Sequence, residues 1–192
     1  SEETGEIKGN DEKIIIDPID GTTNFIHGIP MIGIVISKLI KEEITDGIIY
    51  NPITNDFFWA SKGKGAWCNN KRMRVSKRES IKECLIGTGI PNSKNIDKNY
   101  LDEINQIASS TSGIRRMGSA AIDLAYVASG KLDAFWERNL NIWDVSTGVL
   151  LIKEAGGKVT QPGGNKWDIN SSDILASNAL IHEKIQEKLT KV

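Results

Sequence analysis

Apolar positions follow one rhythm in the first two-fifths of the chain and another rhythm in the rest. Up to about residue 80 they gather in short runs, rich in β-branched residues, at 14–17, 31–40, 44–50 and 57–60. Runs of this length that end at charged or turn-forming residues, such as Lys41-Glu42-Glu43, predict β-strands. We therefore expect an antiparallel meander in this half, with a turn at 63–65 leading into a fourth strand.

After about residue 85 the apolar residues recur mainly at helical spacing, at 97–110, 119–129 and 144–155. Ser119 is a candidate N-cap, and Gly130 and Gly156 follow two of these segments as helix stops. Short strand-like segments are expected at 132–136, 158–160 and 174–177, and a closing helix over 180–190. Strands that alternate with helices predict layered α/β packing.

The expected fold class is therefore α/β (α+β), with a mainly antiparallel half at 1–80 and an α/β half at 81–192. No linker separates the halves, so we expect them to pack as one unit. His27 and His182 are expected at the surface. The five tryptophans are expected in the core or at a subunit interface; they are Trp59, Trp67, Trp136, Trp143 and Trp167.

Composition and charge narrow the function classes. The 192 residues include 24 Lys+Arg and 25 Asp+Glu, a net charge of -1, which argues against a protein that coats nucleic acid. No apolar run approaches the about 20 residues that cross a bilayer, and the start does not resemble a signal peptide. With Cys68 and Cys84 expected as reduced thiols, we expect a cytoplasmic protein. Because the chain does not begin with Met, we expect Ser1 to lie inside a longer sequence.

The densest candidate chemistry is Asp17-Pro18-Ile19-Asp20-Gly21-Thr22-Thr23-Asn24-Phe25. Two carboxylates lie three residues apart at the end of a predicted strand, and Pro18 stiffens the turn between them. Carboxylates held together repel each other unless a cation or a proton lies between them, and Mg²⁺ prefers such oxygen ligands. Gly21 permits a close approach of the backbone to a ligand, and backbone N–H groups near Thr22 could hold an anion. The alternative is an ordinary surface turn with a threonine cap.

Three further acidic features lie far from this stretch. Asp144, in Trp143-Asp144-Val145-Ser146-Thr147-Gly148, stands where a helix is predicted to begin, either as an N-cap or as a metal ligand. Glu137 follows the predicted strand at 132–136. Glu2-Glu3 is either a solvated chain end or part of the same site. The sequence contains neither an EF-hand loop nor a P-loop.

These residues resemble the signatures of the inositol monophosphatase family of Mg²⁺-dependent, lithium-sensitive phosphatases. The stretch from Asp17 to Phe25 matches the first signature without departure, and Trp143–Gly148 with Glu154-Ala155-Gly156-Gly157 matches the second. Ser146 and Thr147 replace smaller residues that are more usual there. Ser1-Glu2-Glu3 is similar to the family's metal motif, and Arg115–Ala121 is similar to its substrate-side loop. The resemblance runs over nearly the whole chain.

The resemblance implies a role for each matching position. Two or three Mg²⁺ ions would be held by Glu2, Asp17, the Ile19 carbonyl, Asp20 and Asp144. Catalysis would depend on Thr22, which would orient the attacking water, together with Asp20 and Glu2. Phosphate and substrate would contact Gly21, Thr22, Thr23, Gly118, Ser119, Ala120 and Glu137, with Glu137 accepting a hydrogen bond from a substrate hydroxyl.

The family fold is a layered αβαβα sandwich, and its first two helices precede the position of Glu2. They carry an acidic residue and a lysine near the metals, so we expect the 192-residue chain alone to be inactive. The implied reaction is hydrolysis of a small phosphate monoester, first of all myo-inositol 1-phosphate, by a homodimer. Thr23-Asn24 and Glu137 favour a polyol substrate. The alternatives are fructose 1,6-bisphosphate or another sugar or nucleotide phosphate, and a regulatory binding protein of the same fold.

Overall fold

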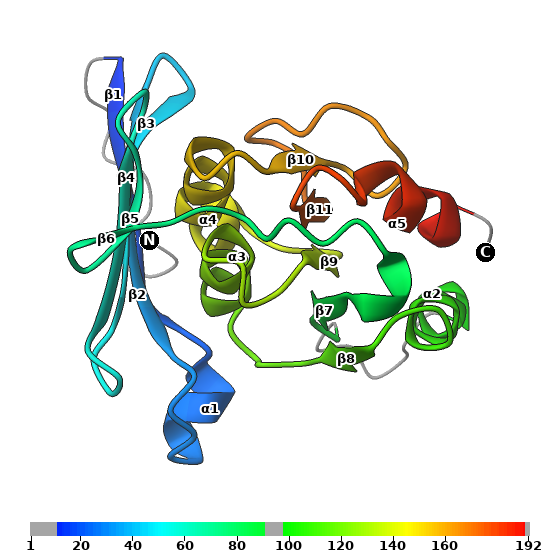
Figure 1. The fold of residues 1–192 in the computed structure, drawn as a ribbon. Helices are drawn as coiled ribbons and strands as arrows, with labels where there is room; N and C mark the ends of the chain where they lie inside the picture. The colour runs from blue at the N-terminus through cyan, green and yellow to red at the C-terminus, as the bar shows by residue number, and fades with distance from the viewer. Residues whose placement is uncertain (1–10, 91–97, 191–192) are drawn as a thin grey trace.

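A computed structural model describes residues 11–90 and 98–190 of the chain. The described part contains two β-sheets with helices between them and on one outer side (Figure 1). Glu2, one of the predicted metal ligands, lies outside the described residues. None of the described helices is long and apolar enough to cross a membrane.

The first sheet is an antiparallel meander in which each strand pairs with the next along the chain. One face of it is buried: Val35, Ser37 and Leu39 alternate with more exposed residues along their strand, the period-two pattern of a half-buried sheet. The strands are β1 (Glu12–Asp20), β2 (Gly33–Ile40), β3 (Glu43–Asn51), β4 (Asp56–Ser61), β5 (Gly65–Cys68) and β6 (Lys71–Arg72).

The second sheet is mixed, with the strand order β10-β11-β9-β7-β8. One side is parallel, because β7 pairs in parallel with both β8 and β9, whereas on the other side β11 pairs antiparallel with both β9 and β10. The strands are β7 (Leu85–Thr88), β8 (Gly113–Arg115), β9 (Ala134–Glu137), β10 (Lys158–Thr160) and β11 (Ile174–Ser177).

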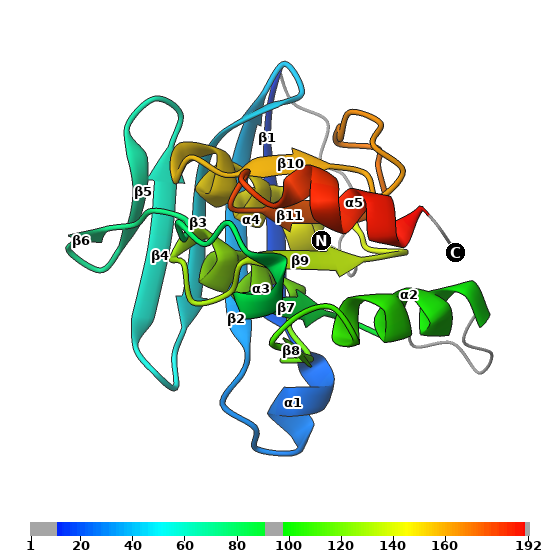
Figure 2. The same ribbon diagram turned by 45° about the vertical axis from the view of Figure 1, so that its right-hand side comes forward.

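Two helices, α3 (Ala120–Ala128) and α4 (Ile142–Glu154), lie between the sheets (Figure 1); α3 buries all but one of its residues, and α4 buries the stretch Val145–Ile152. On the far face of the second sheet, α2 (Lys98–Ala108) and α5 (His182–Leu189) lie side by side (Figures 1 and 2). The short elements are α1 (Thr22–Ile26) and a 3-10 turn, η1 (Ile81–Glu83). The larger hydrophobic cluster fills the space around α3 and α4, and a smaller one lies beneath α2 and α5. Both clusters bury apolar surface, the main favourable contribution to folding.

The outer face of the first sheet carries apolar side chains that are partly exposed. Ile34, Ile36, Ile48, Tyr50 and Phe57 line a shallow hollow on it. The described layers run sheet, helix, sheet, helix, which are four of the five layers of the predicted αβαβα sandwich. An exposed apolar face of this kind is a typical place for a further layer to pack.

Most predicted elements are confirmed, with boundary differences. The first predicted strand runs longer, to Asp20, because the chain continues at the sheet edge beyond Pro18, where a missing N–H costs no ladder bond. The third predicted helix begins at Ile142, so Asp144 is not its N-cap; Asn141 is. The thiols of Cys68 and Cys84 are free, as expected.

The expectation for His182 is wrong. Its ring is fully buried, with Nε2 2.9 Å from Thr160 Oγ1 and Nδ1 2.7 Å from Ser177 Oγ. Burial lowers its pKa to about 4. The imidazole is therefore a neutral bridge between β10, β11 and α5, and the two hydroxyl partners offset the cost of burying a polar ring. His27 is exposed, as expected.

Candidate functional site

A polar cavity of about 550 Å³ opens where the end of β1, the end of β9 and the first turns of α1, α3 and α4 meet. All the predicted site residues within the described ranges line it, although they come from positions 17 to 144 of the chain. They are Asp17, Ile19, Asp20, Gly21, Thr22, Thr23, Gly118, Ser119, Ala120, Glu137 and Asp144.

Three carboxylates converge on one side of this cavity. Asp17, Asp20 and Asp144 each offer one oxygen atom, and these atoms all lie within 4.8 Å of one another. The first two come from the end of β1, where the pairing with β2 becomes irregular between Asp17 and Asp20. Asp144 comes from the first turn of α4. The sequence spacing places the first pair together, and only the fold adds the third.

Asp20 is held by the start of α3. Its Oδ2 atom accepts hydrogen bonds from the Ser119 hydroxyl and from the Ala121 backbone N–H, the latter at 2.8 Å. Burial first, and then the charges of Asp144 and Asp17, raise the pKa of Asp20 to about 7, against the two hydrogen bonds that lower it. A buried carboxyl beside two others needs a proton or a cation.

Asp17, Ile19, Thr22 and Asp144 are held by bonds to nearby backbone. Asp17 Oδ1 accepts from the Ile19 N–H at 3.0 Å, and the Thr22 hydroxyl donates to the Ile19 carbonyl at 3.1 Å. Asp144 Oδ2 accepts from the Asn141 N–H at 2.8 Å, as the acidic member of a capping box. The donor set is all oxygen and anionic, which fits a hard divalent cation such as Mg²⁺.

The turn after Asp20 is tightly enclosed. Gly21 adopts a left-handed φ of 86°, and a Cβ there would lie 2.8 Å from the Met31 carbonyl oxygen. Asn24 Nδ2 donates to the carbonyls of Met31 (2.7 Å) and Met117 (2.8 Å), so it joins the turn to the loop before α3. Only glycine fits position 21 without strain or collision.

Glu137 approaches the cavity from β9, the strand at the centre of the second sheet. Burial first, and then the charges of Asp20 and Asp144, raise its pKa to about 8, and Arg116 opposes this shift. Carboxyl groups whose pKa is raised by burial in a cleft are typical of functional sites.

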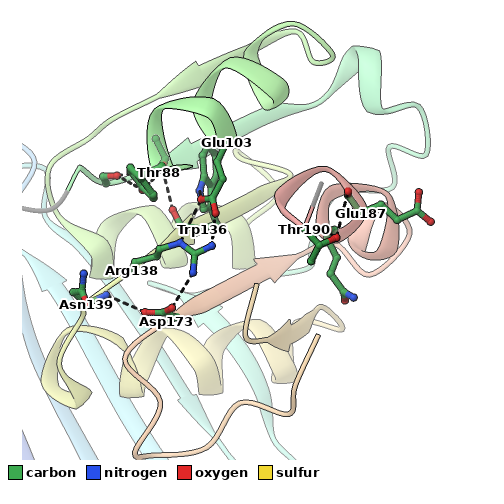
Figure 3. A network of polar contacts seen from close by, with 11 residues as sticks. Thr88, Glu103, Trp136, Arg138, Asn139, Asp173, Glu187 and Thr190 are labelled. Carbon is green, nitrogen blue, oxygen red and sulfur yellow. Dashed lines mark hydrogen bonds and ion pairs between the residues drawn. The ribbon is translucent and has the colours of Figure 1, made fainter. Parts of the chain in front are cut away.

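The residue after Glu137 anchors this strand end from behind (Figure 3). The Arg138 guanidinium forms ion pairs with Glu103 of α2, which is almost fully buried, and with Asp173 at 3.0 Å. Trp136 Nε1 also donates to Glu103, at 3.1 Å, and the Asn139 N–H donates to Asp173, at 3.1 Å. We call these five residues the Arg138 network.

Sequence reasoning missed several residues that line the cavity. Asp123 is buried on α3, its Oδ1 atom has no hydrogen-bond partner, and burial raises its pKa well above the usual range. Asp123 could have been found from the sequence, because it is a single carboxylate within an otherwise apolar helix. Arg116, which belongs to the stretch similar to the family's substrate-side loop, also lines the cavity. Arg138 gave no local signal, because its partners lie 35 residues away on either side.

The fold and this site define a class: a layered α/β protein with an acidic site, suited to a hard cation, at the junction of its two sheets. The chain belongs to the inositol monophosphatase family, whose model matches residues 1–192. This is a metal-dependent family of phosphoric monoester hydrolases.

Known relatives agree with that assignment. An inositol-1-monophosphatase of Caulobacter vibrioides is 46% identical over 194 residues, which is 98% of this chain and 76% of that protein. The crystal structure of the extragenic suppressor protein SuhB from Bartonella henselae is similar, with a TM-score of 0.94, 44% identity and coverage of 98% of this chain and 74% of that one. A Pseudomonas aeruginosa protein named Nus factor SuhB is 44% identical, over 92% of this chain and 68% of its own length.

Proposed function

We propose that this protein hydrolyses a small phosphate monoester, first of all myo-inositol 1-phosphate, to the free polyol and inorganic phosphate with Mg²⁺. The observation that carries this proposal is the convergence of Asp17, Asp20 and Asp144 beside the Gly21-Thr22 turn, in a chain of this family. Fructose 1,6-bisphosphate and other sugar or nucleotide phosphates are the alternative substrates.

In this proposal Asp17, Asp20, Asp144 and the Ile19 carbonyl hold the cations, together with Glu2 outside the described residues. When bound there, Mg²⁺ would acidify water and offset the charge that develops during phosphoryl transfer. The Thr22 hydroxyl would orient the attacking water, and the N–H groups of Gly21 and Thr22 would donate to phosphate oxygens. Asp20 and Glu2 would support the reaction by fixing the cations.

The polyol would lie toward the second sheet. Gly118, Ser119 and Ala120 lead into α3, where small side chains leave room for a ring, and Thr23 lines the same cavity. Glu137 would accept a hydrogen bond from a substrate hydroxyl. A substrate without that hydroxyl would leave the buried carboxyl group without a hydrogen-bond partner, so it would bind much more weakly.

The direct test is phosphate release from myo-inositol 1-phosphate with and without Mg²⁺. It should be run on the full-length protein. We expect Mg²⁺-dependent release and inhibition by lithium. No Mg²⁺-dependent turnover of any sugar or polyol phosphate would refute the proposal.

A regulatory role is the second candidate, favoured by the relative named Nus factor SuhB. The two roles separate in an Asp144→Asn protein. If the protein acts only as a regulator, the wild-type protein should have no phosphatase activity. The Asp144→Asn protein should then bind a transcription complex as well as the wild-type protein does.

We further propose that the protein works as a cytoplasmic homodimer in which residues 1–80 and 81–192 form one packed unit. Phe25, Ile26 and Ile29 support a dimer, because they expose apolar side chains close to the cavity. Sedimentation of the wild-type protein and of an Ile26→Ser variant would test it; the variant should shift toward the monomer.

A further inference from the structure

Gly89, at the end of β7, lies beside Glu137 in the cavity wall. The strands β7 and β9 pair in parallel with Thr88 opposite Trp136, so the next residue of each strand enters the cavity at the same level. A Cβ atom built on Gly89 would overlap all three atoms of the Glu137 carboxyl group, which are its nearest neighbours. The space that an alanine needs at position 89 is therefore the space that the Glu137 carboxyl group fills.

The backbone of Gly89 does not require glycine for its own conformation. Gly89 is absent from the positive-φ glycines, unlike Gly21 and Gly118. Conformational freedom therefore does not explain a glycine at this position, and the three nearest neighbours of an added Cβ all belong to Glu137.

The backbone on this side of the cavity is fixed by buried hydrogen bonds. The Tyr100 hydroxyl donates to the Gly89 carbonyl, and the Thr88 hydroxyl donates to the Trp136 carbonyl at 2.9 Å. Tyr100 and Thr88 are both almost fully buried. A side chain at position 89 would therefore move the Glu137 side chain and leave the strand in place.

The backbone on the Glu137 side is fixed as well. The Arg138 network links the end of β9 to α2 and to the residue before β11 (Figure 3). With both strand ends fixed, the rotatable bonds of Glu137 are the part that can yield. The carboxyl group would then leave the position from which it reaches the cavity.

We propose that Gly89 is a specificity-determining residue: its missing side chain lets the Glu137 carboxyl group take the position from which it selects a hydroxylated substrate. The inference rests on the proposed function. Selection between substrates then depends on two residues: Glu137, which contacts the substrate, and Gly89, whose lack of a side chain leaves space for the Glu137 carboxyl group. A small change at position 89 should alter substrate preference and leave the metal side of the cavity intact.

The test is a double-mutant cycle with two substrates at saturating Mg²⁺, myo-inositol 1-phosphate and p-nitrophenyl phosphate. The proteins are wild type, Gly89→Ala, Glu137→Ala and the double variant, all made in the full-length protein. Gly163→Ala is the matched control, because Gly163 has no atom within 4 Å of an added Cβ and no positive φ.

We expect Gly89→Ala to raise KM for the inositol phosphate about 10-fold and KM for the aryl phosphate less than about 2-fold. The melting temperature should stay near that of the Gly163→Ala protein. In the Glu137→Ala background the same change should have no further effect on either substrate. That result would distinguish selection through Glu137 from general damage to the fold.

Equal losses on both substrates, or a Gly89→Ala effect that persists without Glu137, would overturn the inference. Wild-type protein that hydrolyses neither substrate would overturn the proposed function and the inference together. Wild-type activity with unchanged preference in Gly89→Ala would overturn the inference alone.

Discussion

The two sides of the cavity are built in opposite ways. On one side Asp17, Asp20 and Asp144 bring three carboxylates within 4.8 Å of one another. On the other side Glu137 comes from the second sheet, beside a glycine, and the buried Asp123 comes from α3. Clustered carboxylates need a cation, whereas a buried carboxyl outside such a cluster needs one proton or one hydrogen-bond donor. The first side is thus suited to the chemistry that all substrates share, and the second to choosing among them.

The largest effect should follow a loss on the clustered side. Asp144→Asn removes a proposed metal ligand and no core volume, so kcat should fall on the order of 10³-fold for every substrate while the fold remains. Asp102→Asn, on the exposed face of α2, is the matched control. Measuring kcat against Mg²⁺ concentration checks this, and near-normal activity at saturating Mg²⁺ would remove Asp144 from the metal side.

The next largest effect should follow a loss in the Arg138 network, which anchors the strand end that carries Glu137. Arg138→Gln leaves Glu103 buried without its cation, which should cost about 3 kcal/mol of unfolding free energy. Urea unfolding measures it. Glu183→Gln, which breaks an exposed pair with Lys158, should cost less than about 1 kcal/mol. Equal losses in the two variants would show that the Arg138 network does not hold this side.

A smaller and selective effect should follow Glu137→Gln. The amide keeps the size of the side chain but changes its hydrogen-bonding, so KM for myo-inositol 1-phosphate should rise about 10-fold. KM for p-nitrophenyl phosphate, which lacks the polyol, should change less than about 2-fold. Steady-state kinetics on both substrates check this, and a uniform loss would place Glu137 with the general machinery.

The smallest expected effect is a pH dependence of the stability of the metal-free protein, to which Asp20 on one side of the cavity and Glu137 on the other both contribute. Folding raises the pKa of Asp20 to about 7 and that of Glu137 to about 8, so between pH 4 and 8 these two groups bind more protons in the folded state than in the unfolded state. His182, whose pKa falls to about 4, opposes them with one proton in the lower part of this range. Stability of the metal-free protein should therefore fall as pH rises through this range. Mg²⁺ should raise the melting temperature more at pH 8 than at pH 5, because it replaces the proton that Asp20 otherwise needs.

Thermal unfolding with EDTA or with Mg²⁺ measures this at each pH. The Asp144→Asn protein provides the control, because a weakened metal site should lose most of the Mg²⁺ gain at pH 8. A Mg²⁺ gain that is equal at both pH values would show that the clustered carboxylates are not what the cation stabilises.

The sequence predicts the local parts of this fold well. The strands β2 and β3 and the helix α3 follow from apolar period and from caps such as Ser119, whose side chain accepts from the Ile122 N–H. The spacing of Asp17 and Asp20 likewise identifies half of the carboxylate cluster. These signals lie within a few residues, where the geometry of the chain is fixed by its own bonds.

Long-range contacts explain what the sequence alone could not predict. Asp144 joins the cluster only because α4 packs against the first sheet, and its assignment came from family resemblance. His182 is polar and begins a helix, yet Thr160 and Ser177 from two other strands make its burial favourable. The sequence does not predict the strand β7, because it is only four residues long and contains Gly87, a residue that is unfavourable in strands. Glycine is needed there because the side chains of Leu132, Asp123 and Phe135 occupy the space that a Cβ would take.

The most direct test of the account is the position of a cation in crystals of the protein soaked with Mn²⁺ in place of Mg²⁺. We expect an anomalous peak from an ion bound by Asp17, Asp20 and Asp144 in the wild-type protein. In the Asp144→Asn protein this peak should be lost or weakened. Density away from these carboxylates, or a peak unchanged by the substitution, would contradict the proposed metal site.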